Sequence, residues 1–237
     1  LRQHWGLNPF LALAVTVVFF SIDLAFFSAN VLKIAHGGWF PLVVGGVVYT
    51  LMSTWMAGRK LLGERLRENI LPLELFLTEL LQTSPIRVPG IAVFLSSNPI
   101  GTPAALRHNV AHNHVLHEKV VILTVTTARV PHVPRRQRTT VEHICPGFYR
   151  LQIAYGFMDE PNIPRELSRV RDPDLKFNEE VTYFLGRETL IASPTRPGLW
   201  LWREKLFVLM SSNSQQPMQF FRLPPNQVFE VGVQVEL

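Results

Sequence analysis

The chain has 237 residues, of which 47% are hydrophobic and only 17% charged, and its formal net charge is +5. The charged fraction is below the roughly 25% of ordinary soluble domains, and the abundance of apolar residues excludes a disordered chain. Cys145 is the only cysteine, which excludes a secreted module held together by intrachain disulfides. A basic chain can bind nucleic acid or lie against a membrane, so the positions of the charges decide between these classes.

Two long apolar segments open the chain. The first, residues 9–32, contains one charge, Asp23, and the second, residues 40–58, contains none. Each is long enough to cross a hydrocarbon core of about 30 Å as a helix. The pattern predicts two transmembrane helices over residues 1–58, and the alternative is a buried helical hairpin of a soluble protein. Because the chain starts at Leu1 without a basic n-region or a cleavage site, we expect its true N-terminus upstream.

The charges beside these segments predict an orientation in the membrane. Arg59, Lys60, Arg65 and Arg67 follow the second segment, whereas the connecting loop contains only Lys33. Basic residues concentrate on the cytoplasmic side of membrane proteins. We therefore expect both ends of the transmembrane hairpin to be cytoplasmic, with the basic cluster against anionic lipid.

Asp23 is the one acid inside an apolar segment. A carboxylate within a membrane span costs several kcal/mol unless it is paired, protonated or faces a cavity. Asn30 lies seven residues further on, on the same helical face. Asp23 is therefore a candidate for an ion or proton pathway, and the alternative is an acid near the outer interface that a neighbouring helix or water satisfies.

Beyond Gly58 the pattern changes to short elements. Residues 59–84 predict an amphipathic juxtamembrane connector, and residues 85–237 predict a compact cytoplasmic α/β domain. Val181–Ile191 reads as one strand or as a hairpin at Gly186. The expected strands cover residues 88–95, 120–130, 139–144, 148–157, 181–191 and 228–236, and the expected helices cover residues 104–117, 162–171 and 199–212.

Four histidines cluster between residues 108 and 117. His108 and His112 are four residues apart, so they share a helical face and could bind zinc. His114 falls on another face, and no cysteine is nearby. The favoured interpretation is a polar helix end without a metal, and a metal site at His108 and His112 is the alternative.

Arg135, Arg136 and Arg138 form the densest basic run away from the two apolar segments. Guanidinium groups match phosphate oxygens, so these residues are candidates for a regulatory phosphate ligand, and a solvated loop is the alternative. No aromatic residues interleave with the run, which argues against nucleic acid. The sequence has no Walker-type loop, no G-x-G-x-x-G and no nucleophile elbow, so we expect neither an enzyme nor a cofactor.

Several longer motifs resemble the Kup (KUP/HAK/KT) potassium uptake transporter family. Phe27-Ser28-Ala29-Asn30 with Lys33, and Gly37-Gly38-Trp39 with Pro41-Leu42, are similar to the signature of that family's last two transmembrane helices. The similar motifs further along are Arg87-Val88-Pro89-Gly90, His112-Asn113 with Leu116-His117-Glu118, and Pro131-x-Val133-Pro134.

The resemblance implies that the chain is the C-terminal part of a multi-pass potassium transporter of the cell (inner) membrane, with a proton in symport. It also implies that the potassium site lies in earlier helices, which leaves Asp23 peripheral. A homodimer and a cyclic dinucleotide regulator are further partners that it suggests. The alternative function is a membrane-anchored ligand-binding or regulatory module without transport activity.

Overall fold

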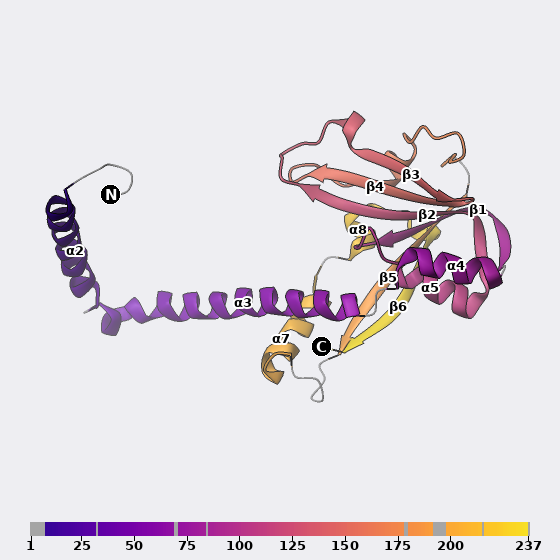
Figure 1. Ribbon diagram of the computed structural model, residues 1–237. Coiled ribbons are helices and arrows are strands. Elements are labelled where there is room, and N and C mark those ends of the chain that lie inside the picture. The colour runs from indigo at the N-terminus through magenta and orange to yellow at the C-terminus, as the bar shows by residue number, and fades with distance from the viewer. Residues whose placement is uncertain are drawn as a thin grey trace. The chain divides into compact units, whose positions relative to one another are not determined.

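The computed structural model describes residues 8–31, 33–68, 71–83, 85–177, 180–191, 198–214 and 216–236 (Figure 1). The chain divides into two compact units, Leu1–Met56 and Ala57–Leu237. The first unit is helical, and the second contains all the strands that the structure describes.

The first unit contains helix α2, Pro9–Val31, and the start of helix α3, Trp39–Glu68. Both helices are long and apolar enough to cross a membrane. No described side chain of α2 is buried, and large apolar side chains such as Phe10 and Phe27 are exposed over most of their surface. Such a surface requires lipid or further helices to cover it.

The two helices are joined by a single π-helical turn, Ile34–Gly38. Gly37 within this turn has φ +114°, a conformation that residues with a Cβ rarely adopt. Gly37 therefore interrupts the helical path, and α3 starts two residues later, at Trp39. Helix α3 then continues past Gly58 to Glu68, so its last turns extend into the predicted connector.

The second unit is built on a six-stranded sheet with the order β3-β4-β2-β1-β5-β6. All neighbouring strands are parallel except β3, which runs antiparallel to β4 across the turn at Gly147. The strands are β1, Ile86–Ser96; β2, Val115–Ala128; β3, Thr139–Cys145; β4, Phe148–Gly156; β5, Val181–Ile191; and β6, Val228–Glu236. The predicted combination of long apolar helices with a mixed α/β sheet is thus confirmed.

The sheet is covered on both faces, and successive residues of β1 enter opposite cores. Ile91 and Val93 belong to one core, whereas Ala92 and Phe94 belong to the other, and all four are fully buried. Side chains alternate along a strand, so a sheet buried on both faces produces continuous apolar runs. This is why β1 and β2 carry no polar alternation at their centres.

Two helices cover the face of the sheet that we call the α4 face. These are α4, Leu73–Thr83, and α5, Ala104–His108, whose buried side chains belong to one hydrophobic core. The buried side chains of α4 recur at helical spacing and include Phe76 and Leu80. The amphipathic part of the predicted connector therefore packs on the sheet.

The opposite face, which we call the α6 face, is covered by α6, Ile163–Leu167, and by residues of α8, Pro217–Phe220, and after it. Helix α7, Leu201–Ser212, lies on the chain between β5 and β6. Its Phe207 is fully buried and lies against Gly58 of α3, where an added Cβ would collide with the ring. This close approach joins α7 to the end of α3.

The predicted helix over residues 104–117 is wrong beyond Asn113. Helix α5 ends at His108, a π-helical turn follows, and β2 already begins at Val115. The Asn109 Nδ2 donates a hydrogen bond to the carbonyl oxygen of Val115 at 2.9 Å, which stabilises the end of the turn. His114 has φ 55° and separates the helix from the strand.

The sequence left open whether residues 181–191 form one strand or a hairpin at Gly186, and the structure shows one strand. Strand β5 is continuous through Gly186 and pairs in parallel with β6 from Tyr183 to Ile191. A hairpin at Gly186 would require antiparallel pairing within this segment, so the segment is one strand.

Candidate functional site

Asp23 lies on α2 with an exposed side chain, like the residues around it. Asn30 donates a hydrogen bond from Nδ2 to the carbonyl oxygen of Phe26 at 2.9 Å, and accepts one from the Lys33 Nζ at 3.4 Å. The side chain of Asn30 is therefore paired with the helix backbone and with Lys33.

His108 and His112 lie together, as their spacing predicts. Their rings are stacked with centroids 5.8 Å apart and an angle of 8° between the ring planes. His114 lies in the left-handed residue after the turn, and His117 lies in β2. Burial lowers the pKa of His117. The four histidines therefore belong to four different local structures, and only His108 and His112 stack on each other.

The three arginines of the basic run have different surroundings. Arg135 and Arg136 are exposed on a 3-10 turn, Arg135–Gln137, between β2 and β3. The side chain of Arg138 is only 11% exposed. Arg135 and Arg136 are thus accessible to a ligand in solution, whereas Arg138 is held inside the second unit.

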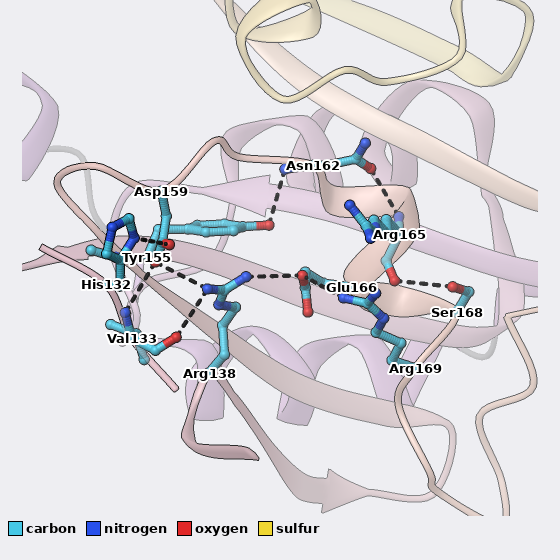
Figure 2. A network of polar contacts seen from close by, with 11 residues as sticks. His132, Val133, Arg138, Tyr155, Asp159, Asn162, Arg165, Glu166, Ser168 and Arg169 are labelled. Carbon is cyan, nitrogen blue, oxygen red and sulfur yellow. Dashed lines mark hydrogen bonds and ion pairs between the residues drawn. The ribbon is translucent and has the colours of Figure 1, made fainter. Parts of the chain in front are cut away.

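The guanidinium group of Arg138 is surrounded by three acceptors (Figure 2). Its Nη2 donates to Asp159 Oδ2 at 3.0 Å and to the carbonyl oxygen of Val133 at 2.9 Å. Its Nη1 donates to Glu166 Oε1 at 3.1 Å, and its Cζ lies 5.1 Å from the centroid of the Tyr155 ring. Arg138 is therefore committed to contacts within the chain.

Asp159 is the second centre of this network. Its Oδ2 accepts hydrogen bonds from the backbone N–H groups of Val133 at 3.1 Å and Gly156 at 2.8 Å. Its Oδ1 lies 2.9 Å from His132 Nδ1. The hydrogen bonds from His132, Val133 and Gly156 hold the pKa of Asp159 well below its usual range, and Arg138 adds to the effect.

Glu166 extends the network into α6. Its Oε1 also accepts from Arg169 Nη1 at 3.1 Å, and its side chain is only 6% exposed. The N-terminus of α6 is capped by Asn162, whose Oδ1 accepts from the backbone N–H of Arg165 at 3.0 Å. The network therefore joins α6 to the connection between β2 and β3. Its two carboxylates, Asp159 and Glu166, are paired with the guanidinium groups of Arg138 and Arg169.

A further cluster contains His143 on β3 with Asp172 and Asp174. One ligand atom from each lies within 4.8 Å of the others, a spacing that could hold a metal ion. His143 Nε2 lies 2.9 Å from Asp172 Oδ2. Burial alone would raise the pKa of Asp172, but the hydrogen bonds from His143 and from the backbone of Asp174 lower it. The contact between His143 and Asp172 joins β3 to the segment before β5.

Sequence reasoning selected Arg138 but missed Asp159, Glu166 and Asp172. Asp159 and Arg138 are 21 residues apart, and Glu166 and Arg138 are 28 apart. No local periodicity links residues at such separations. The one local signal was Asn162 before Pro164, which is a typical start of a short helix.

Comparison with known proteins covers the whole chain. The family model described as the K+ potassium transporter integral membrane domain matches residues 1–60, and the K+ potassium transporter C-terminal domain matches residues 89–237. No solved structure matches the chain.

Curated relatives match along the full chain. A probable potassium transport system protein Kup of Bdellovibrio bacteriovorus is 48% identical over 100% of this chain and 36% of its own length. The proteins of the same name from Myxococcus xanthus and Azoarcus sp. are also 48% identical over 100% of the chain, and it covers 36% and 37% of them. The chain thus spans about a third of these relatives. It belongs to the Kup potassium transporter family.

Proposed function

We propose that the chain is the C-terminal part of a transporter that takes up potassium, with a proton in symport, across the cell (inner) membrane. The observation that carries the proposal is the succession of an integral-membrane match and a C-terminal-domain match along one chain. The exposed apolar surface of α2 supports it, because that surface requires neighbouring helices or lipid. Two helices alone do not surround an ion, so the remaining helices of the full-length protein supply the pathway.

The proposal includes an arrangement in the membrane. Residues 1–58 form the last two spans as a transmembrane hairpin, residues 59–84 connect them to the sheet, and residues 85–237 form a cytoplasmic domain. The basic residues at the end of α3, from Arg59 to Arg67, support the cytoplasmic side for that end.

Rubidium uptake by cells tests the transport proposal. The full-length gene is expressed in a host that lacks its own potassium uptake systems, and uptake is compared with that of the empty vector. We expect uptake above the vector that rises when the external medium is acidified and falls when a protonophore is added. Full-length protein in the membrane without uptake would contradict transport and favour the anchored module.

Asp23 is proposed as the acid of this chain to test for a role in the ion or proton pathway. The variants Asp23→Asn and Asp23→Glu are compared in the rubidium assay at equal protein levels. A pathway role predicts that Asn abolishes the response of uptake to external pH and that Glu retains it. Wild-type behaviour of both variants would assign Asp23 to the periphery of the transporter.

The anchored regulatory module remains the second candidate because Arg135 and Arg136 are exposed beside each other. In this form of the proposal the two side chains bind the phosphates of a cyclic dinucleotide, and a homodimer presents two such loops. Calorimetric titration of the full-length protein in detergent with cyclic di-AMP tests it. Binding that survives Arg135→Gln combined with Arg136→Gln would contradict this site.

A further inference from the structure

Helix α7 packs on the end of α3 rather than on the sheet. The ring of Phe207 occupies the space beside Gly58, and Leu61 of α3 lies against Gly198, so an added Cβ at either glycine would collide with its neighbour. Glu204 and Phe207 are the buried residues of α7, and among the residues that the structure describes neither belongs to the two cores of the sheet. The position of α7 is therefore set by the last part of α3.

This part of α3 is also where the membrane domain ends. The match to the integral membrane domain covers residues 1–60, and the second apolar segment ends at Gly58. Arg59 and Lys60 follow directly and are exposed. Because Phe207 contacts Gly58 and Gly198 contacts Leu61, α7 begins and packs at the level where α3 passes from the hydrocarbon core into the headgroup region.

Hydrogen bonds to Glu204 fix the start of α7. The Oε1 of Glu204 accepts from the backbone N–H groups of Leu199 at 3.1 Å and Gly198 at 3.4 Å. The carbonyl oxygen of Trp200 accepts from the backbone N–H of Glu204 at 3.1 Å. Glu204 and Phe207 are three residues apart and share one side of the helix. These contacts determine which side of α7 faces away from α3.

The side that faces away is apolar with a lysine at its centre. Trp202, Lys205 and Leu209 follow at spacings of three and four residues, so they share this side of the helix. Trp202 is 50% exposed and Leu209 is 60% exposed, and Trp200, directly before the helix, is 76% exposed. Large apolar side chains gathered on one surface mark a contact with a membrane or with a protein.

Lys205 favours a membrane over a protein as the partner of this face. Lysine is depleted at the centres of protein–protein interfaces. At a membrane surface, in contrast, tryptophan rings lie at the level of the headgroups, and a lysine among apolar side chains extends its ammonium group to the phosphates. Arg59 and Lys60 next to Gly58 add positive charge close to the same contact, and this charge favours anionic lipid.

We propose that α7 binds the surface of an anionic phospholipid membrane, with Trp202 and Leu209 inserted among the lipids and Lys205 on their phosphates. The surface goes beyond potassium transport, because it gives the second unit a lipid contact of its own outside the two spans. The proposal rests on the proposed function, in which α3 leaves the membrane near Gly58.

Spin labelling of the full-length protein tests the depth of α7. The native cysteines are replaced by serine, Leu209→Cys is labelled with a nitroxide, and the protein is reconstituted into vesicles of phosphatidylglycerol and phosphatidylcholine. Oxygen concentrates in hydrocarbon and a nickel chelate stays in water, so the ratio of their collision rates with the label reports its depth. We expect the label about 5–10 Å deep in the boundary between headgroups and acyl chains. Trp202→Cys offers a second position on this face and should give the same result.

Phe157→Cys is the matched control for the label. Phe157 is apolar and 61% exposed, and it follows β4, far along the chain from α7. Its label should collide mainly with the chelate. Labels on Leu209→Cys and Phe157→Cys that are equally accessible to the chelate would overturn the proposal.

Lys205→Gln tests the preference for anionic lipid. In the Leu209→Cys background it should raise the collision rate with the chelate, and replacing phosphatidylglycerol by phosphatidylcholine should raise it in the same direction. Lys176→Gln makes the same charge change at another exposed position and should leave the rate unchanged. A depth that depends neither on Lys205 nor on the anionic lipid would overturn the binding of anionic phospholipid.

Other occupants of this face give different results in the same experiment. Dipolar broadening between labels, in detergent and in vesicles alike, would show that a second copy covers it, and protection from both oxygen and the chelate would show a protein contact. Either result overturns the proposal. A label in lipid together with no rubidium uptake, or with a reporter fusion that places the C-terminus outside the cell, would contradict the proposed function and leave the lipid contact of α7 intact.

Discussion

The guanidinium group of Arg138 connects three segments of the second unit through Val133, Asp159 and Glu166. The side chains of Asp159 and Glu166 are 11% and 6% exposed, and Arg138 pairs with both of them, beside Arg169 at Glu166 and the backbone N–H groups at Asp159. Removing one partner of a buried ion pair leaves the remaining charges without compensation. The network therefore stabilises the fold, and its loss should lower the free energy of unfolding.

Arg138→Met should lower the free energy of unfolding, because it removes a cation from Glu166, whose side chain is 6% exposed. Urea unfolding of the chain in detergent, followed by circular dichroism, measures the change. Arg136→Met is the matched control, since Arg136 is exposed and its replacement should change stability by less than about 0.5 kcal/mol. Equal effects of the two variants would contradict the structural role of Arg138.

The lowered pKa of Asp159 predicts that the protein loses stability in acid. Its pKa in the folded state lies below its value of about 3.9 in an unfolded chain, so its contribution is complete above that value. The contribution declines as the pH falls below about 4 toward the folded-state pKa. Thermal unfolding midpoints between pH 7 and pH 2.5 should therefore fall more steeply for the wild type than for Asp159→Asn. Parallel curves for the two proteins would contradict the prediction.

At the scale of elements, α4 shows how an amphipathic segment becomes part of the core. Leu80 is 4% exposed and packs on the sheet, whereas Leu75 on the same helix is 57% exposed. Leu80→Ala should lower the free energy of unfolding by about 2–5 kcal/mol through lost burial and a residual cavity. Leu75→Ala is the matched control and should change it by less than about 0.5 kcal/mol. Similar losses in both variants would show that α4 does not pack as described.

The hairpin between β3 and β4 depends on Gly147. Its φ of +80° disfavours a side chain, and an added Cβ would lie 2.7 Å from the carbonyl oxygen of Glu118. Gly147→Ala should therefore cost about 1–3 kcal/mol of stability. Gly186→Ala is its control, because an added Cβ there meets no atom within 4 Å. Urea unfolding of both variants checks the prediction, which fails if Gly147→Ala is neutral.

The sequence predicted whether a segment is a helix or a strand wherever a single hydrophobic period continued along the whole segment. The alternating residues of β6 and the 3.6-residue period of α4 were recognisable in the sequence. The end of α5 was not recognisable in the sequence. It is set by the hydrogen bond from Asn109 to Val115 and by the burial of the apolar residues of β2 in the sheet. Tertiary burial here overrode a helical pattern that the polar residues of this segment support only weakly.

At the scale of the whole molecule, the proposed orientation has a direct test. If the basic end of α3 is cytoplasmic, a green fluorescent protein fused to the C-terminus of the full-length protein should fluoresce, and an alkaline phosphatase fusion at the same site should be inactive. Replacing Arg59, Lys60, Arg65 and Arg67 by glutamine should shift a fraction of the molecules toward the opposite result, because these residues supply the positive charge. Active phosphatase in the wild-type fusion would contradict the orientation.

The sequence by itself determined the two long apolar helices, most strand positions and the family, because chain length, periodicity and ordered motifs are local properties. Only the tertiary structure decided the strand order, the continuity of β5, the burial of Arg138 beside two exposed arginines, and the packing of α7 on α3. These features arise where residues distant in sequence come into contact, and the free energy of burying or pairing them depends on the packed surroundings rather than on their neighbours along the chain.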